Sequence, residues 1–101
     1  MSDARVLTLR IITPTGASEP VTCDSVHFPI PDDVNGRGGG SFGVRPGHER
    51  AVAALAPGLI AAFLGGEPCF SAETDGGFVS IRPDSVTVAS ESFSEIGPDK
   101  A

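Results

Sequence analysis

The chain of 101 residues contains no tryptophan, no tyrosine and one methionine, so its core must be built from aliphatic side chains and six phenylalanines. Basic residues are also few, with seven Lys and Arg against thirteen Asp and Glu, a net charge of −6. Nucleic-acid binding depends on basic side chains that displace counterions from phosphates. The charge balance therefore argues against a nucleic-acid partner.

Long hydrophobic runs are absent as well. The longest apolar run, Leu59 to Leu64, is six residues, whereas a membrane-spanning helix needs about 18 or more. The first five residues are not followed by the apolar segment of a signal peptide. We therefore expect a soluble protein with no direct membrane insertion.

Cysteine and histidine are scarce, which limits metal and redox chemistry. Cys23 and Cys69 are far apart in the sequence, and without an export signal we expect buried free thiols rather than a disulfide. The two histidines, His27 and His48, lack the paired spacing typical of metal ligands. No nucleophile and base pair stands out either, so we expect no metal, no cofactor and no catalytic residue.

What the chain does contain is a series of short alternating segments separated by glycine and proline. Alternation of apolar and polar residues predicts half-buried strands, and regular turn signals between them predict an all-β antiparallel β-sandwich. We expect two packed sheets of about ten short strands over residues 1–90, with a polar and disordered tail over 91–101. The expected strands cover residues 7–12, 21–23, 26–30, 42–44, 59–64, 69–74, 78–82 and 86–89.

Several local features carry separate predictions. A change of alternation phase predicts a β-bulge near Asp24 and Ser25. Asp75 to Gly77 resembles a hairpin turn, followed by Phe78 as a core residue, and Leu59, Ile60 and Phe63 are also expected in the core. The segment from Glu49 to Ala56 is compatible with either a helical turn or a strand.

Half of the residues from Gly39 to His48 are glycine or proline. Arg45-Pro46-Gly47-His48 predicts a type II turn, and Pro31 to Gly40 predicts a mobile loop. The loop could present a surface to a partner, or it could simply be a long hairpin connection. A phosphate-binding role is disfavoured because the glycine run has no lysine and precedes a strand rather than a helix.

The motifs together resemble the N-terminal β-sandwich domain of the ε subunit of F-type ATP synthases, called δ in mitochondria. Gly40 to His48 resembles the family signature that ends in Pro-Gly-His. Four further parts of the chain match the family pattern in order. They are the opening strand and turn, the end of the second strand, a later Pro-Gly turn and the last hairpin. Their residues are Leu9 to Gly16, Val26 to Pro29, Leu55 to Gly58, Gly76 to Val79 and Pro83 to Val88.

The resemblance implies a non-catalytic subunit of the rotating central stalk, which couples ion-driven rotation to ATP synthesis or hydrolysis. It implies binding to the γ subunit and to the membrane c-ring, and a peripheral location on the cytoplasmic face of the inner (cell) membrane. Carried over residue by residue, the contacts with γ are His48, Glu49, Arg50, Val52 and Ala53. Those with the c-ring are Gly38, Gly39, Gly40, Ser41 and Phe42.

Three departures from the family pattern stand out. Ser41 and Phe42 replace the usual acidic residue and aliphatic residue, which removes a carboxylate from the expected ring contact. The loop from Pro31 to Gly39 is longer than usual, and no C-terminal helical hairpin is expected in a chain that ends at Ala101. The alternative to the stalk subunit is a stand-alone acidic β-sandwich that binds a small ligand or a peptide.

Overall fold

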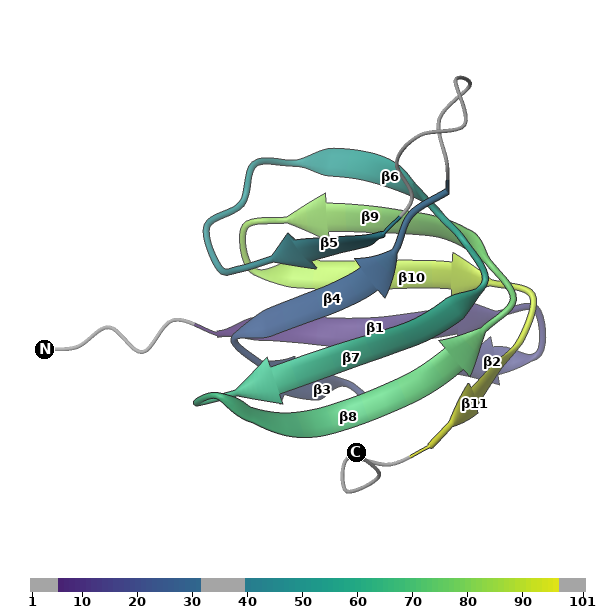
Figure 1. Ribbon diagram of the computed structural model, residues 1–101, viewed down its shortest axis with the longest axis horizontal. Helices are drawn as coiled ribbons and strands as arrows, with labels where there is room; N and C mark the ends of the chain where they lie inside the picture. The colour runs from purple at the N-terminus through teal and green to yellow at the C-terminus, as the bar shows by residue number, and fades with distance from the viewer. Residues whose placement is uncertain (1–5, 32–39, 97–101) are drawn as a thin grey trace, which may run out of the picture.

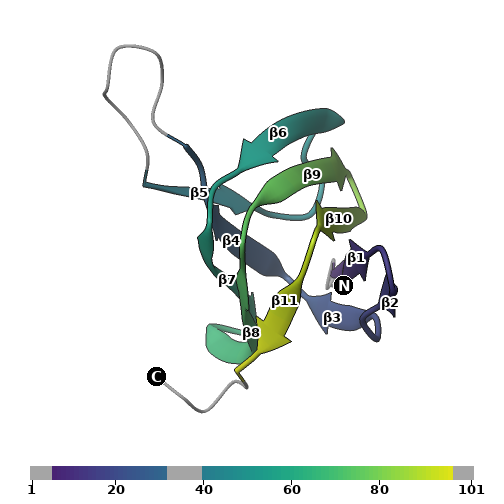
Figure 2. The same ribbon diagram turned by 90° about the vertical axis from the view of Figure 1, so that its right-hand side faces the viewer.

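The computed structural model describes residues 6–31 and 40–96, and all of their regular structure is β-strand. The strands form two facing sheets, which Figures 1 and 2 show as separate layers and which confirm the predicted sandwich. The described strands are β1 (Leu7–Thr13), β2 (Gly16–Ala17), β3 (Val21–Cys23), β4 (Ser25–Pro29), β5 (Ser41–Val44), β6 (Ala51–Leu55), β7 (Gly58–Leu64), β8 (Glu67–Thr74), β9 (Gly77–Arg82), β10 (Ser85–Ser90) and β11 (Phe93–Glu95).

The first sheet has the order β2-β1-β10-β9-β6, and β3 also pairs with β1. The second sheet has the order β11-β8-β7-β4-β5. Most neighbours are antiparallel, but β1 and β10 run parallel, with a register from Thr8 opposite Ser85 to Ile12 opposite Ala89. This parallel pairing joins the first and one of the last strands at the centre of the first sheet.

The core lies between the sheets and follows the alternation of the strands. Leu7, Leu9 and Ile11 of β1 are fully buried, as are Val86 and Val88 of the adjacent β10. Aliphatic and aromatic side chains of the second sheet face them, namely Val26, Phe28, Val44, Ile60, Ala62, Phe70 and Ala72. The segment with two possible structures, Glu49 to Ala56, contains the edge strand β6 (Ala51–Leu55) and no helical turn.

The phase change near Asp24 has a different cause from the predicted bulge. β3 pairs with β1 in the first sheet, whereas β4 pairs with β5 and β7 in the second sheet. The chain therefore changes sheets at Asp24, and the inward-facing parity changes with it. The prediction of a bulge at this position is wrong; a register shift occurs instead between Ala62 and Phe63.

The segment Asp75 to Gly77 is another crossing between the sheets, not the predicted hairpin. It connects β8 of the second sheet to β9 of the first. Phe78 then points outward and is 62% exposed, because its neighbour Val79 takes the buried position. Phe78 is thus wrongly predicted as a core residue. The prediction of Leu59 as a core residue is also wrong, because its side chain is 50% exposed. Ile60 is buried as predicted, and Phe63 is half-buried.

A buried hydroxyl pair fixes this crossing. Thr74 and Ser90 lie with their hydroxyl oxygens 2.6 Å apart. The Gly76 N–H donates to the Thr74 hydroxyl at 3.2 Å, and the Ser90 hydroxyl lies 3.2 Å from an Asp75 carboxylate oxygen. The polar groups of two adjacent chain crossings thereby satisfy one another, as buried polar groups must.

The fold extends past the predicted domain boundary at residue 90. Phe93 to Glu95 form β11, which pairs antiparallel with β8. Phe93 packs against the core, so the prediction of a disordered tail is wrong for these residues. Residues 97–101 of the predicted tail lie outside the described residues.

Both cysteines are free, as predicted. Cys23 is fully buried, whereas Cys69 is only half-buried. Burial raises the pKa of the Cys23 thiol from its ordinary 9.0 to about 11, with smaller contributions from Cys69 and Asp24. Burial also raises the pKa of Cys69. Both thiols are therefore poor nucleophiles at neutral pH, because the thiolate is the reactive form.

We expect a thiol-specific reagent at pH 8 to label Cys69 first and Cys23 only when the chain unfolds. Mass spectrometry of the labelled protein with and without urea measures this order.

The raised pKa of Cys23 also makes stability depend on pH. In the folded chain the Cys23 thiol keeps its proton up to about pH 11, whereas the exposed thiol keeps it only up to about pH 9.0. Stability should therefore fall as pH rises through this window, and Cys23→Ala should reduce that fall. Rapid labelling of Cys23 in the native chain would contradict this burial.

Gly77 is the glycine on which the crossing most depends. Its φ is +142°, and a Cβ at this position would lie 2.0 Å from the Ala89 carbonyl oxygen. Gly77→Ala should lower the free energy of unfolding by about 3 kcal/mol or more. Gly65 has φ +63° with open space around it, so Gly65→Ala should cost only about 1 kcal/mol. Urea denaturation of both variants tests this, and equal losses would show that the clash is unimportant.

Candidate interaction site

The signature segment begins at the base of the glycine loop. Gly40 has φ +81°, and its carbonyl accepts a hydrogen bond from the Ile30 N–H at 3.0 Å. β5 then pairs with β4, which places Phe42 opposite Phe28 and Gly43 opposite His27. Phe42 is half-buried and packs against the core. The loop is therefore anchored at its base to the second sheet.

The turn that follows has the predicted type II geometry. The His48 N–H donates to the Arg45 carbonyl at 3.3 Å, and Gly47 has φ +90°, which this turn requires at its third residue. The Gly47 N–H donates to the Pro83 carbonyl at 2.8 Å. Because Pro83 lies between β9 and β10, this bond ties the turn to the first sheet.

Aromatic contacts connect the turn to the core. The Phe42 ring lies 5.5 Å from that of Phe28 and 6.0 Å from that of His48, measured between centroids. The His48 Nδ1 lies 2.6 Å from the Glu49 carbonyl oxygen, so the ring is held on two sides. Such edge-to-face and tilted arrangements are the favoured ones for ring pairs. His48 is therefore a positioned side chain, half-buried rather than freely exposed.

His27 lies on the outer face of the second sheet, at the exposed position that strand alternation predicts. Its ring contacts Phe63 edge-on, with centroids 5.5 Å apart. The ring also covers Gly43, where an added Cβ would lie 3.1 Å from the His27 Cε1. Gly43 thus leaves the space into which the imidazole packs.

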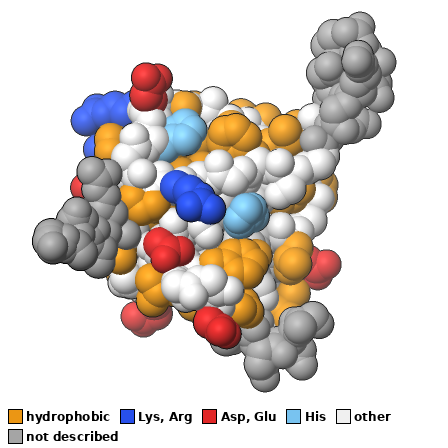
Figure 3. Space-filling model, turned by 60° about the vertical axis from the view of Figure 1, so that its left-hand side comes forward, with side chains coloured by type: hydrophobic (Ala, Val, Ile, Leu, Met, Phe, Trp, Pro, Cys, Tyr) orange, Lys and Arg blue, Asp and Glu red, His pale blue; other side chains and the backbone are white. Residues whose placement is uncertain are grey.

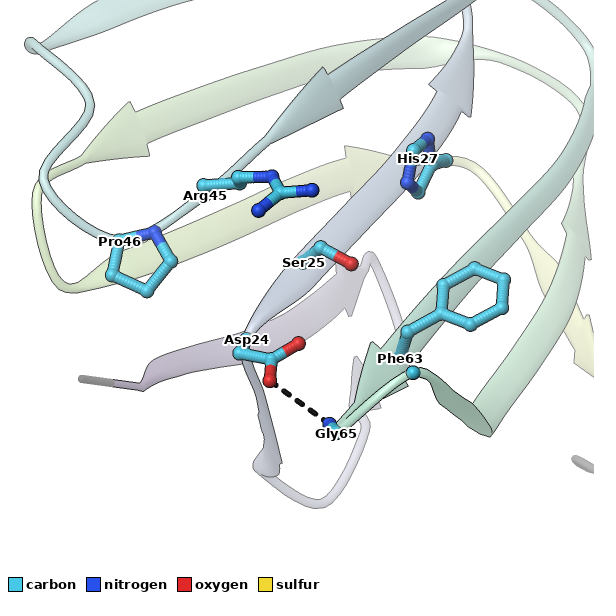
Figure 4. A pocket seen from close by; sticks show the side chains of 8 residues that line it. Asp24, Ser25, His27, Arg45, Pro46, Phe63 and Gly65 are labelled. Atoms are coloured by element: carbon cyan, nitrogen blue, oxygen red, sulfur yellow. Dashed lines mark hydrogen bonds between the residues drawn. The ribbon is translucent and has the colours of Figure 1, made fainter. Parts of the chain in front are cut away.

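A shallow hollow opens beside His27 (Figure 4). Arg45 reaches toward β4 between Ser25 and His27, and Phe63 forms the opposite wall. The Asp24 carboxylate accepts a hydrogen bond from the Gly65 N–H at 2.9 Å, which fixes the rim of the hollow. Figure 3 shows both histidines and a basic side chain on one face of the molecule. This surface offers a cation, imidazole edges and an aromatic ring to a partner.

Within residues 6–31 and 40–96, no three His, Cys, Asp or Glu side chains converge as a metal site would need. The two histidines contact aromatic rings and a carbonyl rather than a nucleophile. None of the described segments forms a helix of the length and hydropathy that a membrane span requires.

The predicted γ contacts divide between two locations. His48, Glu49 and Arg50 lie in the connection between β5 and β6, where Glu49 and Arg50 are exposed. Val52 points outward from the first sheet and is 73% exposed. Ala53 is half-buried and packs against the core, so its side chain faces away from the surface on which Val52 lies.

The predicted c-ring contacts also differ from one another. Gly38 and Gly39 lie outside the described residues. Gly40 and Ser41 are exposed at the base of the loop, whereas the Phe42 side chain points inward. Phe42 is therefore less available as contact area than the sequence suggests.

Sequence reasoning missed the hollow formed by Asp24, His27, Arg45 and Phe63. These residues are distributed over two strands and two corners, so no spacing along the chain unites them. One signal was available: in the β4–β5 hairpin, a glycine opposite an outward-facing histidine marks a place where a ring covers the backbone.

The contact between Gly43 and His27 predicts non-additive mutations. Gly43→Ala should cost about 1 kcal/mol because the new Cβ displaces the His27 ring. In a His27→Ala background the same change should cost almost nothing, because the ring is gone. Urea denaturation of the four variants gives the coupling energy. Strictly additive losses would show that the imidazole does not pack on Gly43.

Comparison with known proteins agrees with this geometry. A family model described as the ATP synthase delta/epsilon chain β-sandwich domain matches residues 6–96. No match is found among curated protein sequences. A chain in a cryo-EM structure of Euglena gracilis mitochondrial ATP synthase, comprising OSCP, F1 and c-ring in rotational state 1, has the same fold, with a TM-score of 0.69 and 20% identity.

That alignment covers 92% of this chain and 54% of the Euglena chain, so this chain spans about half the length of the protein it matches. At this identity the structural match establishes the fold, whereas the family model covers nearly the whole sequence. The chain therefore belongs to the family of ATP synthase delta/epsilon β-sandwich domains.

Proposed function

We propose that this chain is a non-catalytic rotor subunit of an F-type ATP synthase that binds γ and the membrane c-ring. It would transmit ion-driven rotation to the catalytic head through γ and carry out no bond chemistry itself. It would act at the periphery of the membrane, on the cytoplasmic face of the inner (cell) membrane. The family match and the positioned turn after β5 support this proposal.

The proposed γ contact is supported best by the attachment of the Pro-Gly-His turn to both sheets. Gly47 is bonded to the first sheet through Pro83, while Phe42 and Phe28 connect His48 to the core. A surface that transmits torque must not deform when its partner turns. His48, Glu49, Arg50 and Val52 form the proposed γ contact because they are held on this braced connection and the strand that follows it.

For the c-ring, the proposed contact lies at the exposed base of the glycine loop, at Gly40 and Ser41. Ser41 has no charge, so the contact would rely on backbone approach and hydrogen bonding rather than on an ion pair. Phe42 would act indirectly, through the His48 ring that it supports. Phe42→Ala would accordingly disturb both contacts, which makes it unsuitable for separating them.

The test is co-purification of this chain with its cognate γ subunit. The wild-type chain should form a stoichiometric complex, and Val52→Asp should weaken it at least tenfold, about 1.4 kcal/mol. Val52 is 73% exposed, so a charge there should leave the fold intact. His48→Ala should weaken the complex as well, because it removes a positioned ring. Affinity by titration calorimetry measures each loss.

Leu59→Asp is the matched control, since Leu59 is an exposed hydrophobic residue on the outer face of the second sheet. It should leave γ binding unchanged. If the folded wild-type chain forms no complex at micromolar concentrations, the rotor assignment fails. If Leu59→Asp and Val52→Asp weaken binding equally, the proposed γ surface is misplaced.

A further inference from the structure

The two cysteines lie close together in the fold, although they are far apart in the sequence. Cys23 is the last residue of β3, immediately before the chain crosses from the first sheet to the second at Asp24. Cys69 lies on β8 of the second sheet. The Cys69 thiol donates a hydrogen bond to the carbonyl oxygen of Thr22, the neighbour of Cys23, at 3.7 Å. The contact therefore joins β3 and β8, which Figure 1 draws beside each other.

A β-bulge turns the Cys69 side chain toward β3. Pro68 and Phe70 of β8 pair with consecutive residues of β7, so Cys69 between them has no partner residue in the ladder. Phe70 faces the core, and strict alternation would send Cys69 to the outer face of the sheet. Its side chain packs against the core instead and reaches the Thr22 carbonyl. Bulges re-aim side chains in this way.

The Cys23 sulfur is within reach of the Cys69 sulfur. A carbonyl oxygen lies about 2.8 Å from the Cα of the next residue, so the Cys69 sulfur lies at most about 6.5 Å from the Cys23 Cα. The Cys23 thiol now donates to the Leu7 carbonyl of β1 at 3.8 Å, and a rotation about its Cα–Cβ bond would turn the sulfur toward Cys69. The electrostatic effect of Cys69 on the pKa of Cys23 agrees with this proximity.

The surroundings of the pair favour thiol chemistry over metal binding. No third His, Cys, Asp or Glu side chain within residues 6–31 and 40–96 joins the two cysteines as a metal ligand would. The sequence has no other cysteine, so each thiol has one possible disulfide partner within the chain. Cys69 is half-buried and accessible to a small reagent, whereas Cys23 is fully buried.

We propose that Cys23 and Cys69 are an oxidisable pair that closes to a disulfide between β3 and β8, with a small-molecule disulfide such as oxidised glutathione as the electron acceptor. The Cys69 thiolate attacks one sulfur of the acceptor, which forms a mixed disulfide and releases one thiolate. The Cys23 thiolate then attacks the Cys69 sulfur and releases the second thiolate. The pair loses two electrons, the acceptor gains them, and the released thiolates take up the two protons.

The disulfide would tie the edge of the first sheet to the second sheet. β3 is attached to its own sheet only through β1, so a covalent bond to β8 would restrain it from its free side. Cross-linking residues 23 and 69 would also restrict the unfolded chain. Oxidation would therefore make the sandwich harder to unfold. This inference goes beyond the proposed function, because it does not depend on binding to γ or to the c-ring.

The rate of closure follows from the protonation of the two thiols. Burial raises the pKa of both, so little thiolate is present at neutral pH and exchange should be slow. The exposed edge of Cys69 makes it the first thiol to react. Cys23 then needs to reach only a neighbouring sulfur, without exposure to solvent. The pair would respond to sustained oxidation rather than to a brief pulse of oxidant.

The test equilibrates the purified full chain with glutathione buffers of graded ratio at pH 8, both without urea and in concentrated urea. Acid quenching, alkylation and peptide mapping by mass spectrometry then measure the Cys23–Cys69 disulfide. The effective concentration of the pair should be at least tenfold higher in the folded chain than in urea. By linkage the oxidised chain should also resist unfolding, with a urea midpoint raised by about 1 M or more.

Two variants serve as controls. Cys69→Ser keeps a small polar group at a half-buried position, so it should fold, form no internal disulfide and show no rise in urea midpoint on oxidation. Cys23→Ala should accumulate a stable mixed disulfide at Cys69, because no second thiol displaces the glutathione. If Cys23→Ala does not fold, the wild-type chain and Cys69→Ser still decide the outcome.

Three outcomes contradict the proposal. The first is a folded wild-type chain that keeps glutathione on Cys69 at equilibrium and forms no internal disulfide. The second is an equal effective concentration of the pair with and without urea, which would show that the fold does not bring the thiols together. The third is a disulfide between two chains, with a yield that rises with protein concentration, which would assign Cys69 to a contact between copies.

Discussion

The parallel pairing of β1 with β10 is the constraint on which the rest of the sandwich depends. It joins residues 7–13 to residues 85–90 at the centre of the first sheet, so β2 and β3 are attached to the remaining strands of that sheet only through it. The paired strands bury Leu7, Leu9, Ile11, Val86 and Val88. Because the contact closes nearly the whole chain into one loop, it requires most of the chain to be in place and favours slow, cooperative folding.

The chain corners are as important as the strands for positioning the candidate site. At Asp24 the chain changes sheets, and the carboxylate bonds to Gly65 of the β7–β8 turn. At Asp75 it changes sheets again, above the buried Thr74 and Ser90 hydroxyls. The Pro-Gly-His turn is bonded to Pro83 of the opposite sheet. Each corner therefore connects the two layers, and the proposed γ contact after the Pro-Gly-His turn is held by a hydrogen bond to the first sheet and by ring contacts with the second.

The two outer faces of the sandwich differ in character. The outer face of the second sheet carries His27 and Phe63 around an open hollow, with Arg45 and the Asp24 carboxylate at its edge. The outer face of the first sheet carries exposed apolar side chains, among them Ile12, Phe78 and Val52.

The sequence by itself determined the fold class, the position of most strands, the type II turn and the free thiols. Alternation, turn residues and φ preferences are local properties that neighbouring residues encode. Only the tertiary structure decided which sheet each strand joins, and therefore which face of a strand is buried. The sequence predicts Phe78 and Leu59 as core residues, but both lie outside, because the chain changes sheets just before each strand. The hollow at His27 and the alignment of Ile12, Ala89 and Phe78 across the first sheet likewise depend on register between distant strands, which no local pattern specifies.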